Sequence, residues 1–180
     1  MGRTGKMKPL LHTWKALTTD RSLPPLVVGG ASVPWSDVQL VITGEQSSIA
    51  SGLSNVVQLG FVDDQTRWDL LRGAEALVNP SLYESLSLIL LEAWAVERPV
   101  VVNALCDVTR GLTSRADGGL AVDFSAPAAA ARAIAAGLAS DERRAAFGNS
   151  GCRFASSTYV WDDVLDMYED AARASVSRRA

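Results

Sequence analysis

The sequence predicts an α/β fold, with a parallel sheet flanked by helices and a helical C-terminal tail. Short apolar runs alternate along the chain with segments of helical character, an order that favours βαβ units. The apolar runs are nearly continuous in valine, leucine and isoleucine, as expected for strands buried on both faces of a sheet. With 180 residues, 48% of them hydrophobic, the chain can bury the core of one domain.

Each element follows from this alternation in chain order. We expect strands at residues 26–28, 38–43, 56–59, 76–78, 99–103 and 120–122. We expect helices at residues 8–17, 66–73, 88–96, 127–139, 141–156 and 161–174. The last two helices follow one another without a strand between them, which predicts the helical tail. The domain is therefore expected to span residues 1–175, with residues 176–180 fraying.

The composition indicates which kinds of partner and which cellular setting the protein can have. A net charge of −3 lacks the basic field that non-specific nucleic-acid binding needs. Cys106 and Cys152 are too few for a disulfide framework or a zinc site, which favours a reduced setting. Residues 1–9 lack the apolar stretch of a signal peptide, and no run approaches the roughly 20 apolar residues of a membrane span. We expect a cytoplasmic protein with no direct membrane segment and no nucleic-acid partner.

The most informative segment is residues 79–103, NPSLYESLSLILLEAWAVERPVVVN. Glu84 and Glu92 lie eight residues apart across the start of the expected helix. Eight helical residues advance the chain by about 12 Å and turn it by about 80°, so the two carboxylates can bind different sugar rings of one elongated ligand. The helix start between them attracts an anion. Hydroxyls at both ends and negative charge in the middle are the features of a nucleotide sugar.

The same segment resembles the donor-binding segment of GT-B glycosyltransferases of family 4, which reads roughly PS-x-x-E-G-F-G-x4-E-A-x-A-x-G-x-PVV. The residues in register are Pro80, Ser81, Glu84, Glu92, Ala93, Ala95, Pro99, Val100 and Val101. The chain departs from the pattern at 85–87, where Ser-Leu-Ser replaces Gly-Phe-Gly, and at 97–98, where Glu-Arg lies near the usual Gly-Lys. The resemblance implies a Rossmann-like domain, the C-terminal half of a GT-B fold.

The resemblance gives each glutamate a role. It implies that Glu92 accepts hydrogen bonds from the nucleotide ribose and that Glu84 contacts the donor sugar. A solvated glutamate on an amphipathic helix is the alternative for Glu92, although its neighbours in sequence are apolar. The alternative for Glu84 is a capping box with Ser81, in which the carboxylate satisfies an N–H at the helix start.

The turn into the helix carries the remaining donor contacts. By resemblance, the backbone N–H groups of Ser85, Leu86 and Ser87 face the donor sugar, and that of Leu88 faces the diphosphate. Ser85 or Ser87 can also be a simple N-cap, and the two roles are compatible because an N-cap and an anion site occupy the same place.

Two further pairs of residues match the family. Arg3 and Lys8 resemble the cations that neutralise the donor diphosphate, which helps a leaving nucleotide as its charge grows. A solvated basic terminus is the alternative for both. Phe61 and Val62 resemble a turn near the nucleobase, with a strand end and a core aromatic as the alternative. No metal site, cofactor or assured catalytic residue is expected in this half.

The resemblance covers almost the whole chain but only half of the parent enzymes. It implies that the N-terminal acceptor-binding domain and the first strand of the donor domain are missing, which should expose a sheet edge or leave a groove. We therefore expect the nucleotide-sugar binding domain of a retaining, metal-independent hexosyltransferase, inactive without a separate acceptor-binding domain. The alternative is a non-catalytic remnant or binding module. An unrelated dinucleotide-binding protein is disfavoured because G-x-G-x-x-G is absent.

Overall fold

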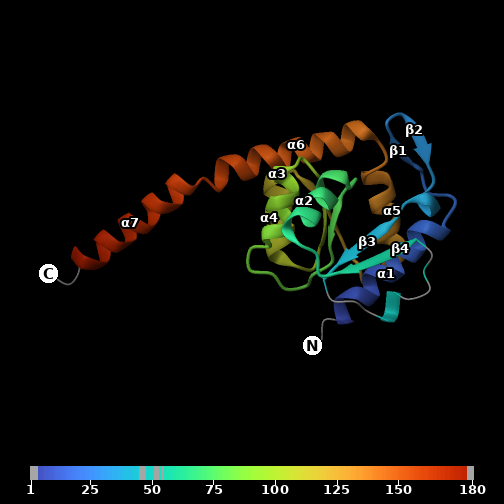
Figure 1. Ribbon diagram of the computed structural model, residues 1–180, viewed down its shortest axis with the longest axis horizontal. Helices are drawn as coiled ribbons and strands as arrows, with labels where there is room; N and C mark the ends of the chain where they lie inside the picture. Colours follow the sequence, from blue (N-terminus) through green and yellow to red (C-terminus); the bar gives the residue numbers. More distant parts are fainter. Residues whose placement is uncertain (1–3, 45–47, 51–52, 54, 178–180) are drawn as a thin grey trace.

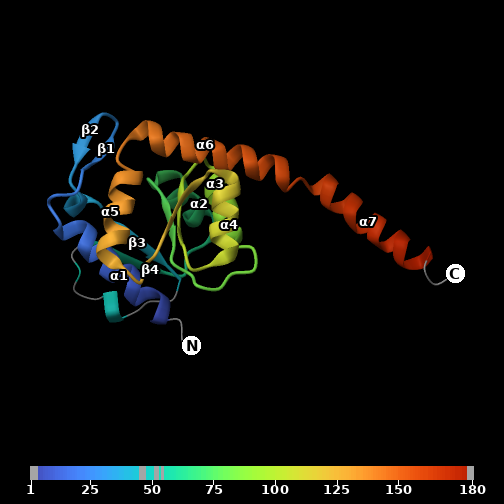
Figure 2. The ribbon, with the colours of Figure 1, turned by 180° about the vertical axis from the view of Figure 1, so that it is seen from behind.

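The computed structural model describes residues 4–44, 48–50, 53 and 55–177 (Figures 1 and 2). Its strands are β1 Leu26–Val28, β2 Ala31–Val33, β3 Leu40–Thr43, β4 Val56–Gly60, β5 Leu77–Asn79, β6 Val100–Asn103 and β7 Gly119–Val122. Its α-helices are α1 Thr4–Thr19, α2 Asp64–Gly73, α3 Leu88–Ala95, α4 Asp107–Ala116, α5 Pro127–Gly137, α6 Asp141–Thr158 and α7 Trp161–Ser177. Its 3-10 helices are η1 Trp35–Asp37 and η2 Ser48–Ala50.

The described strands form three hydrogen-bonded groups. β5, β6 and β7 lie side by side in that order and are parallel, and β3 and β4 form a second parallel pair. β1 and β2 form an antiparallel hairpin. The predicted α/β class with parallel strands is confirmed. Because the carboxyl ends of parallel strands meet at one edge, the loops after β5 and β6 are neighbours.

Helices cover both faces of the three-stranded group, and β6 shows why. Val100, Val101 and Val102 are all fully buried. Val101 packs into a cluster with α1 and α5, whereas Val100 and Val102 pack into a second cluster with α2, α3 and α4. Successive side chains of a strand point to opposite faces. An unbroken valine run therefore supplies both cores.

The prediction that residues 26–28 belong to the parallel sheet is wrong. These residues form β1, but β1 pairs with β2 as a two-residue hairpin. Gly29 and Gly30 form its turn with φ of 56° and 80°. Two successive positive φ values are what a type I′ hairpin turn requires and what glycine adopts at no steric cost.

Helix α4 was not expected from the sequence. Gly111 lies in its middle, and its threonines are weak helix formers. The helix is nevertheless amphipathic, since Thr109, Leu112, Thr113 and Ala116 are its buried residues. That spacing of three, one and three residues is the signature of a helix with one face on the core.

Trp94 packs α3 tightly against the rest of the domain. Its ring is fully buried, and its Nε1–H donates to the carbonyl of Gly118 at 2.9 Å. A Cβ on Gly151 of α6 would collide with the same ring, and Phe154 of α6 packs edge-on against it at 6.1 Å between ring centroids. This close packing fixes the position of α3, which carries Glu92.

The tail leaves the body of the molecule. α6 crosses the body, and α7 continues outward from it in both views (Figures 1 and 2). The large apolar residues of α7, among them Trp161, Leu165 and Tyr168, are exposed. The helix runs to Ser177, two residues into the segment that we expected to fray, and residues 178–180 lie outside the described part.

Candidate functional site

Two asparagines at the ends of neighbouring strands hold the loop that contains Glu84. Asn79 ends β5, and its side chain accepts from the N–H of Ser81 at 3.0 Å and donates to Ser87 Oγ at 2.8 Å. Asn103 ends β6 and donates to the carbonyl of Pro80 at 3.0 Å. The Asn79 amide also lies 3.4 Å from Glu84 Oε1, at the edge of hydrogen-bond distance. Loop 80–87 is thus tied to the carboxyl ends of the strands.

The asparagines are an addition to the residues expected from the sequence. The sequence does contain a pattern that could have predicted them, because an asparagine directly follows an apolar run at both 79 and 103. What the sequence lacks is the pairing of β5 with β6, which brings the two strand ends to the same loop.

Helix α3 begins at Leu88, with Ser87 as its N-cap residue. Ser87 is left-handed, with φ of 63° and ψ of 71°, and its hydroxyl makes no capping bond to the helix. It bonds to Asn79 instead. The capping-box alternative for Glu84 is therefore wrong, because Glu84 precedes the helix by four residues and Ser81 lies in the loop. The first N–H groups of α3 remain available to an anion.

Glu92 lies one turn into α3 and is not a solvated helix residue. Its side chain is 23% exposed, and Oε1 lies 3.3 Å from Arg67 Nη1 of α2. Its other oxygen, Oε2, is buried without a hydrogen-bond partner among the described residues. A carboxylate with one buried oxygen unpaired can accept further hydrogen bonds, and leaving it unpaired costs free energy.

Arg67 was missed by sequence reasoning. It lies in the polar run at the start of α2, where Asp63 caps the helix by accepting from the N–H of Thr66 at 2.7 Å. This bond holds the pKa of Asp63 below its ordinary value of 3.8. Arg67 also pairs with Asp64 at 3.2 Å, so it keeps one partner if Glu92 is removed.

Exposed apolar side chains surround this edge. Phe61 follows β4 and is 84% exposed, Tyr83 and Leu88 flank the turn into α3, and Leu105 follows β6. Each follows the carboxyl end of a parallel strand, where α/β domains bind their ligands. Val62, beside Phe61, is half-buried.

The other residues that the sequence predicts for the site make no hydrogen bond or ion pair with the side chain of Glu84 or Glu92 among the interactions that the structure describes. Ser85 is exposed and Leu86 is half-buried in the loop before α3. Lys8 lies on α1 with an exposed side chain, and it forms no ion pair within the part of the chain that the structure describes. Arg3 lies outside the described residues. Among the described residues, no group of three or more His, Cys, Asp and Glu side chains is arranged to hold a metal ion.

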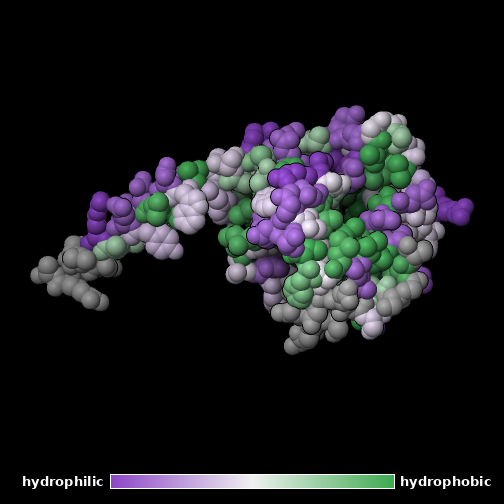
Figure 3. Space-filling model, viewed as in Figure 1, coloured by the Kyte–Doolittle hydropathy of each residue, from purple (hydrophilic) through white to green (hydrophobic). Residues whose placement is uncertain are grey.

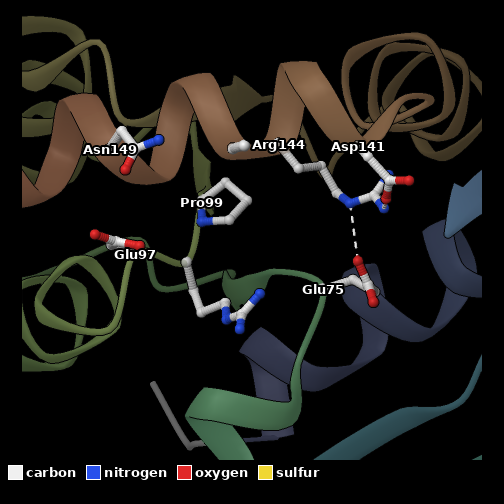
Figure 4. A pocket seen from close by; sticks show the side chains of 8 residues that line it. Glu75, Glu97, Pro99, Asp141, Arg144 and Asn149 are labelled. Atoms are coloured by element: carbon white, nitrogen blue, oxygen red, sulfur yellow. Dashed lines mark hydrogen bonds and ion pairs between the residues drawn. The ribbon is translucent and has the colours of Figure 1, made fainter. Parts of the chain in front are cut away.

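A cavity of about 270 Å³ lies at the opposite ends of the strands, beside Glu75 and Pro99, which precede β5 and β6 (Figure 4). Its dominant group is Arg144 of α6, whose guanidinium is already committed. Its donors bond to Glu75 Oε2 at 2.9 Å, Asp141 Oδ1 at 2.6 Å and the carbonyls of Leu138 and Val27 at 2.7 and 2.6 Å. Arg144 thus joins α6 to the hairpin through Val27, and its guanidinium is engaged by these bonds rather than free for a ligand.

The chain is an α/β domain with parallel strands, and Glu84 and Glu92 lie at the carboxyl ends of those strands, the edge at which domains of this class bind their ligands. The family described as glycosyl transferases group 1 matches residues 10–140. The chain belongs to this family, and the resemblance found in the sequence is confirmed.

The chain is similar to curated relatives over part of their length. It is 35% identical over 114 residues to the D-inositol 3-phosphate glycosyltransferase of Xylanimonas cellulosilytica, covering 61% of this chain and 27% of the relative. It is 32% identical over 148 residues to the phosphatidyl-myo-inositol mannosyltransferase of Mycobacterium leprae, covering 77% of this chain and 39% of the relative. The chain thus spans well under half of these relatives.

Solved structures show the same fold. Sucrose-phosphate synthase from Thermosynechococcus elongatus matches with a TM-score of 0.72 at 20% identity, covering 96% of this chain and 43% of that one. WaaG, a glycosyltransferase involved in lipopolysaccharide biosynthesis, matches with a TM-score of 0.63 at 18% identity, covering 93% and 45%. The match is to the C-terminal half of these GT-B enzymes. Within the described residues, no helix has the length and apolar character to cross a membrane.

Proposed function

We propose that this chain binds the nucleotide-diphosphate-sugar donor of a retaining, metal-independent glycosyltransferase. Sugar transfer then requires an acceptor-binding half that residues 4–177 do not supply. The observation that carries the proposal is the pair of carboxylates on either side of the exposed start of α3, one of which, Glu92, has a buried oxygen without a partner.

Each part of the donor has a matching group at this edge. The partner-free oxygen of Glu92 accepts from the ribose hydroxyls, and Glu84 accepts from hydroxyls of the sugar. The diphosphate lies at the N-terminus of α3, where the N–H groups of Leu88 and the preceding turn favour negative charge. Phe61, largely exposed after β4, offers a ring against which a base can stack.

Titration calorimetry with UDP-, GDP- and ADP-sugars tests the proposal. GDP-mannose belongs in the panel because one relative is named a mannosyltransferase. The wild-type chain should bind one class of nucleotide sugar. Glu92→Ala should weaken that binding by about 1.5–3 kcal/mol, the scale of hydrogen bonds to a charged group, which is roughly 10- to 150-fold.

Glu97→Ala is the matched control. Glu97 is exposed just beyond the other end of α3, away from the strand ends that carry the site. The Glu97→Ala substitution removes the same charge as Glu92→Ala and should leave the affinity for the nucleotide sugar unchanged. The fold of Glu92→Ala should survive, since Arg67 keeps its ion pair with Asp64. Equal affinity of wild type and Glu92→Ala, with circular dichroism unchanged, would remove Glu92 from the site.

A further inference from the structure

A large apolar groove separates the two parallel groups of strands. Its volume is about 880 Å³, with β3 along one wall and β5 along the other. α1 and α2 close its two faces, because α1 packs with the cluster on one face of the strands and α2 with the cluster on the other. Hydrophobic side chains gather around a hollow on this side of the body (Figure 3). Strand edges on two sides and helices on the other two make a space shaped for one more strand.

The strands beside the groove lack the burial of a central strand. β6 has a neighbour on each side, and its valines are fully buried. β5 pairs with β6 alone among the described residues, and Leu77 and Val78 are only half-buried although their side chains are as apolar as those of β6. Val41, in the middle of β3, lines the groove and is 40% exposed. An apolar strand centre open to water is uncommon in α/β sheets, whose strands are covered on both faces.

The walls also define the direction and length of the occupant. β3 is parallel to β4, and the chain passes from β4 through α2 into β5, the kind of strand–helix–strand connection that joins parallel strands. A strand between β3 and β5 can therefore pair in parallel with both. β3 has four residues, which at about 3.3 Å per residue sets a length of roughly 13 Å.

Two buried polar atoms point to a peptide rather than a purely apolar ligand. Thr13 and Trp14 of α1 both line the groove, with exposed fractions of 1% and 8%. Thr13 Oγ1 and Trp14 Nε1 are buried and have no hydrogen-bond partner within the described ranges. Buried polar groups are nearly always paired in folded proteins. The ladders with β3 and β5 use the backbone groups of a central strand, so these two atoms need a polar side chain or a backbone group at the strand's end. A peptide has such groups and a purely apolar ligand lacks them.

We propose that this groove binds an apolar β-strand of about four or five residues, supplied by the half of these enzymes that the chain does not span. The strand adds in parallel between β3 and β5 and joins the two groups into one sheet. The occupant that fits is a strand from the other half of these enzymes, because the chain spans only 43–45% of the solved structures that it matches. The proposal rests on the groove and is independent of donor binding.

A synthetic strand tests the groove. The probe is an acetylated, amidated peptide with five consecutive valines and isoleucines between pairs of lysines. Trp14 and Trp35 both line the groove, so tryptophan fluorescence should change in a saturable way on titration. Hydrogen exchange should slow for the amides of β3 and β5 and stay unchanged for α7. The same peptide with alternate backbone nitrogens methylated should bind at least about tenfold more weakly, because it cannot complete a ladder.

Two substitutions of an apolar residue by aspartate distinguish binding in the groove from non-specific binding of the apolar peptide elsewhere on the surface. Val41→Asp, in the groove, should weaken peptide binding at least about tenfold. Leu165→Asp, on α7 and 53% exposed, should leave it unchanged. Equal binding of the methylated peptide, or full competition by a fatty acid, would show an apolar site without strand addition and overturn the proposal. A stable dimer with β3 and β5 already protected would also overturn it, because a second copy would then be the occupant.

Discussion

Replacing Glu97 by glycine is expected to stabilise the domain. Glu97 follows the last turn of α3 with φ of 58°, in the left-handed region that residues with a Cβ rarely adopt. Its N–H donates to the carbonyl of Trp94 at 2.9 Å, and its own carbonyl lies so close to Gly148 of α6 that a Cβ there would collide. The helix end and the neighbouring helix therefore hold Glu97 in this conformation.

The size of the effect follows from two opposing terms. A left-handed residue with a Cβ costs roughly 1–2 kcal/mol. Glycine removes that cost but loses more conformational freedom on folding, about 0.5–1 kcal/mol. The net gain is then about 0.5–1 kcal/mol. For a domain of this size, 1 kcal/mol shifts the Tm by roughly 2–4 °C, so the Tm should rise by about 1–4 °C.

Urea and thermal unfolding of three variants decide whether the backbone is the cause. Glu97→Ala removes the charge and keeps the Cβ, so it should not stabilise. Asp117→Gly should stabilise in the same way as Glu97→Gly, because Asp117 ends α4 with φ of 45°. If Glu97→Ala stabilises as much as Glu97→Gly, the gain comes from the side chain and the reasoning from φ is refuted.

Three further predictions concern the site, its supporting helix and the whole chain. Glycine at both Ser85 and Ser87 should leave donor affinity within about a factor of ten, because backbone N–H groups bind the anion; loss of all binding in calorimetry would make the hydroxyls ligands. The pKa of Asp63 is lowered on folding by the N–H of Thr66, so its contribution is present above pH 3.8 and is lost as the pH falls below it. Urea unfolding should therefore show a stability advantage of wild type over Asp63→Ala that shrinks on acidification; a constant advantage contradicts this. Finally, the purified chain with nucleotide sugars and acceptors should release no nucleotide above hydrolysis, since transfer needs an acceptor held in a closed cleft; acceptor-dependent release would show a complete enzyme.

Most elements were predictable because their signals are local. All six expected strands and all six expected helices exist, with boundaries shifted by a few residues. The misses have physical causes. The Gly29–Gly30 turn is a hairpin signal that the alternation of strands and helices concealed. α4 carries Gly111 and threonines, so its weak propensity hid a clear amphipathic spacing.

The candidate site was predictable in part. The segment around Glu84 and Glu92 was found from spacing and from family resemblance, and both flank the start of α3 in the structure. Arg67 was not found, because its pairing with Glu92 depends on how α2 lies against α3. No pattern within either helix encodes that contact. Residues that act through another element become visible only when the elements are assembled.

Three positions at which the family pattern has glycine carry other residues in this chain, namely Ser85, Ser87 and Glu97. Ser87 and Glu97 adopt positive φ, whereas Ser85 does not. At Ser87 and Glu97 the backbone therefore has the left-handed conformation that glycine adopts freely. At Ser87 the hydroxyl bonds to Asn79 and offsets part of the strain. Glu97 has no hydrogen bond or ion pair of its side chain within the described residues to offset it, which is why the glycine variant there should give the clearer gain in stability.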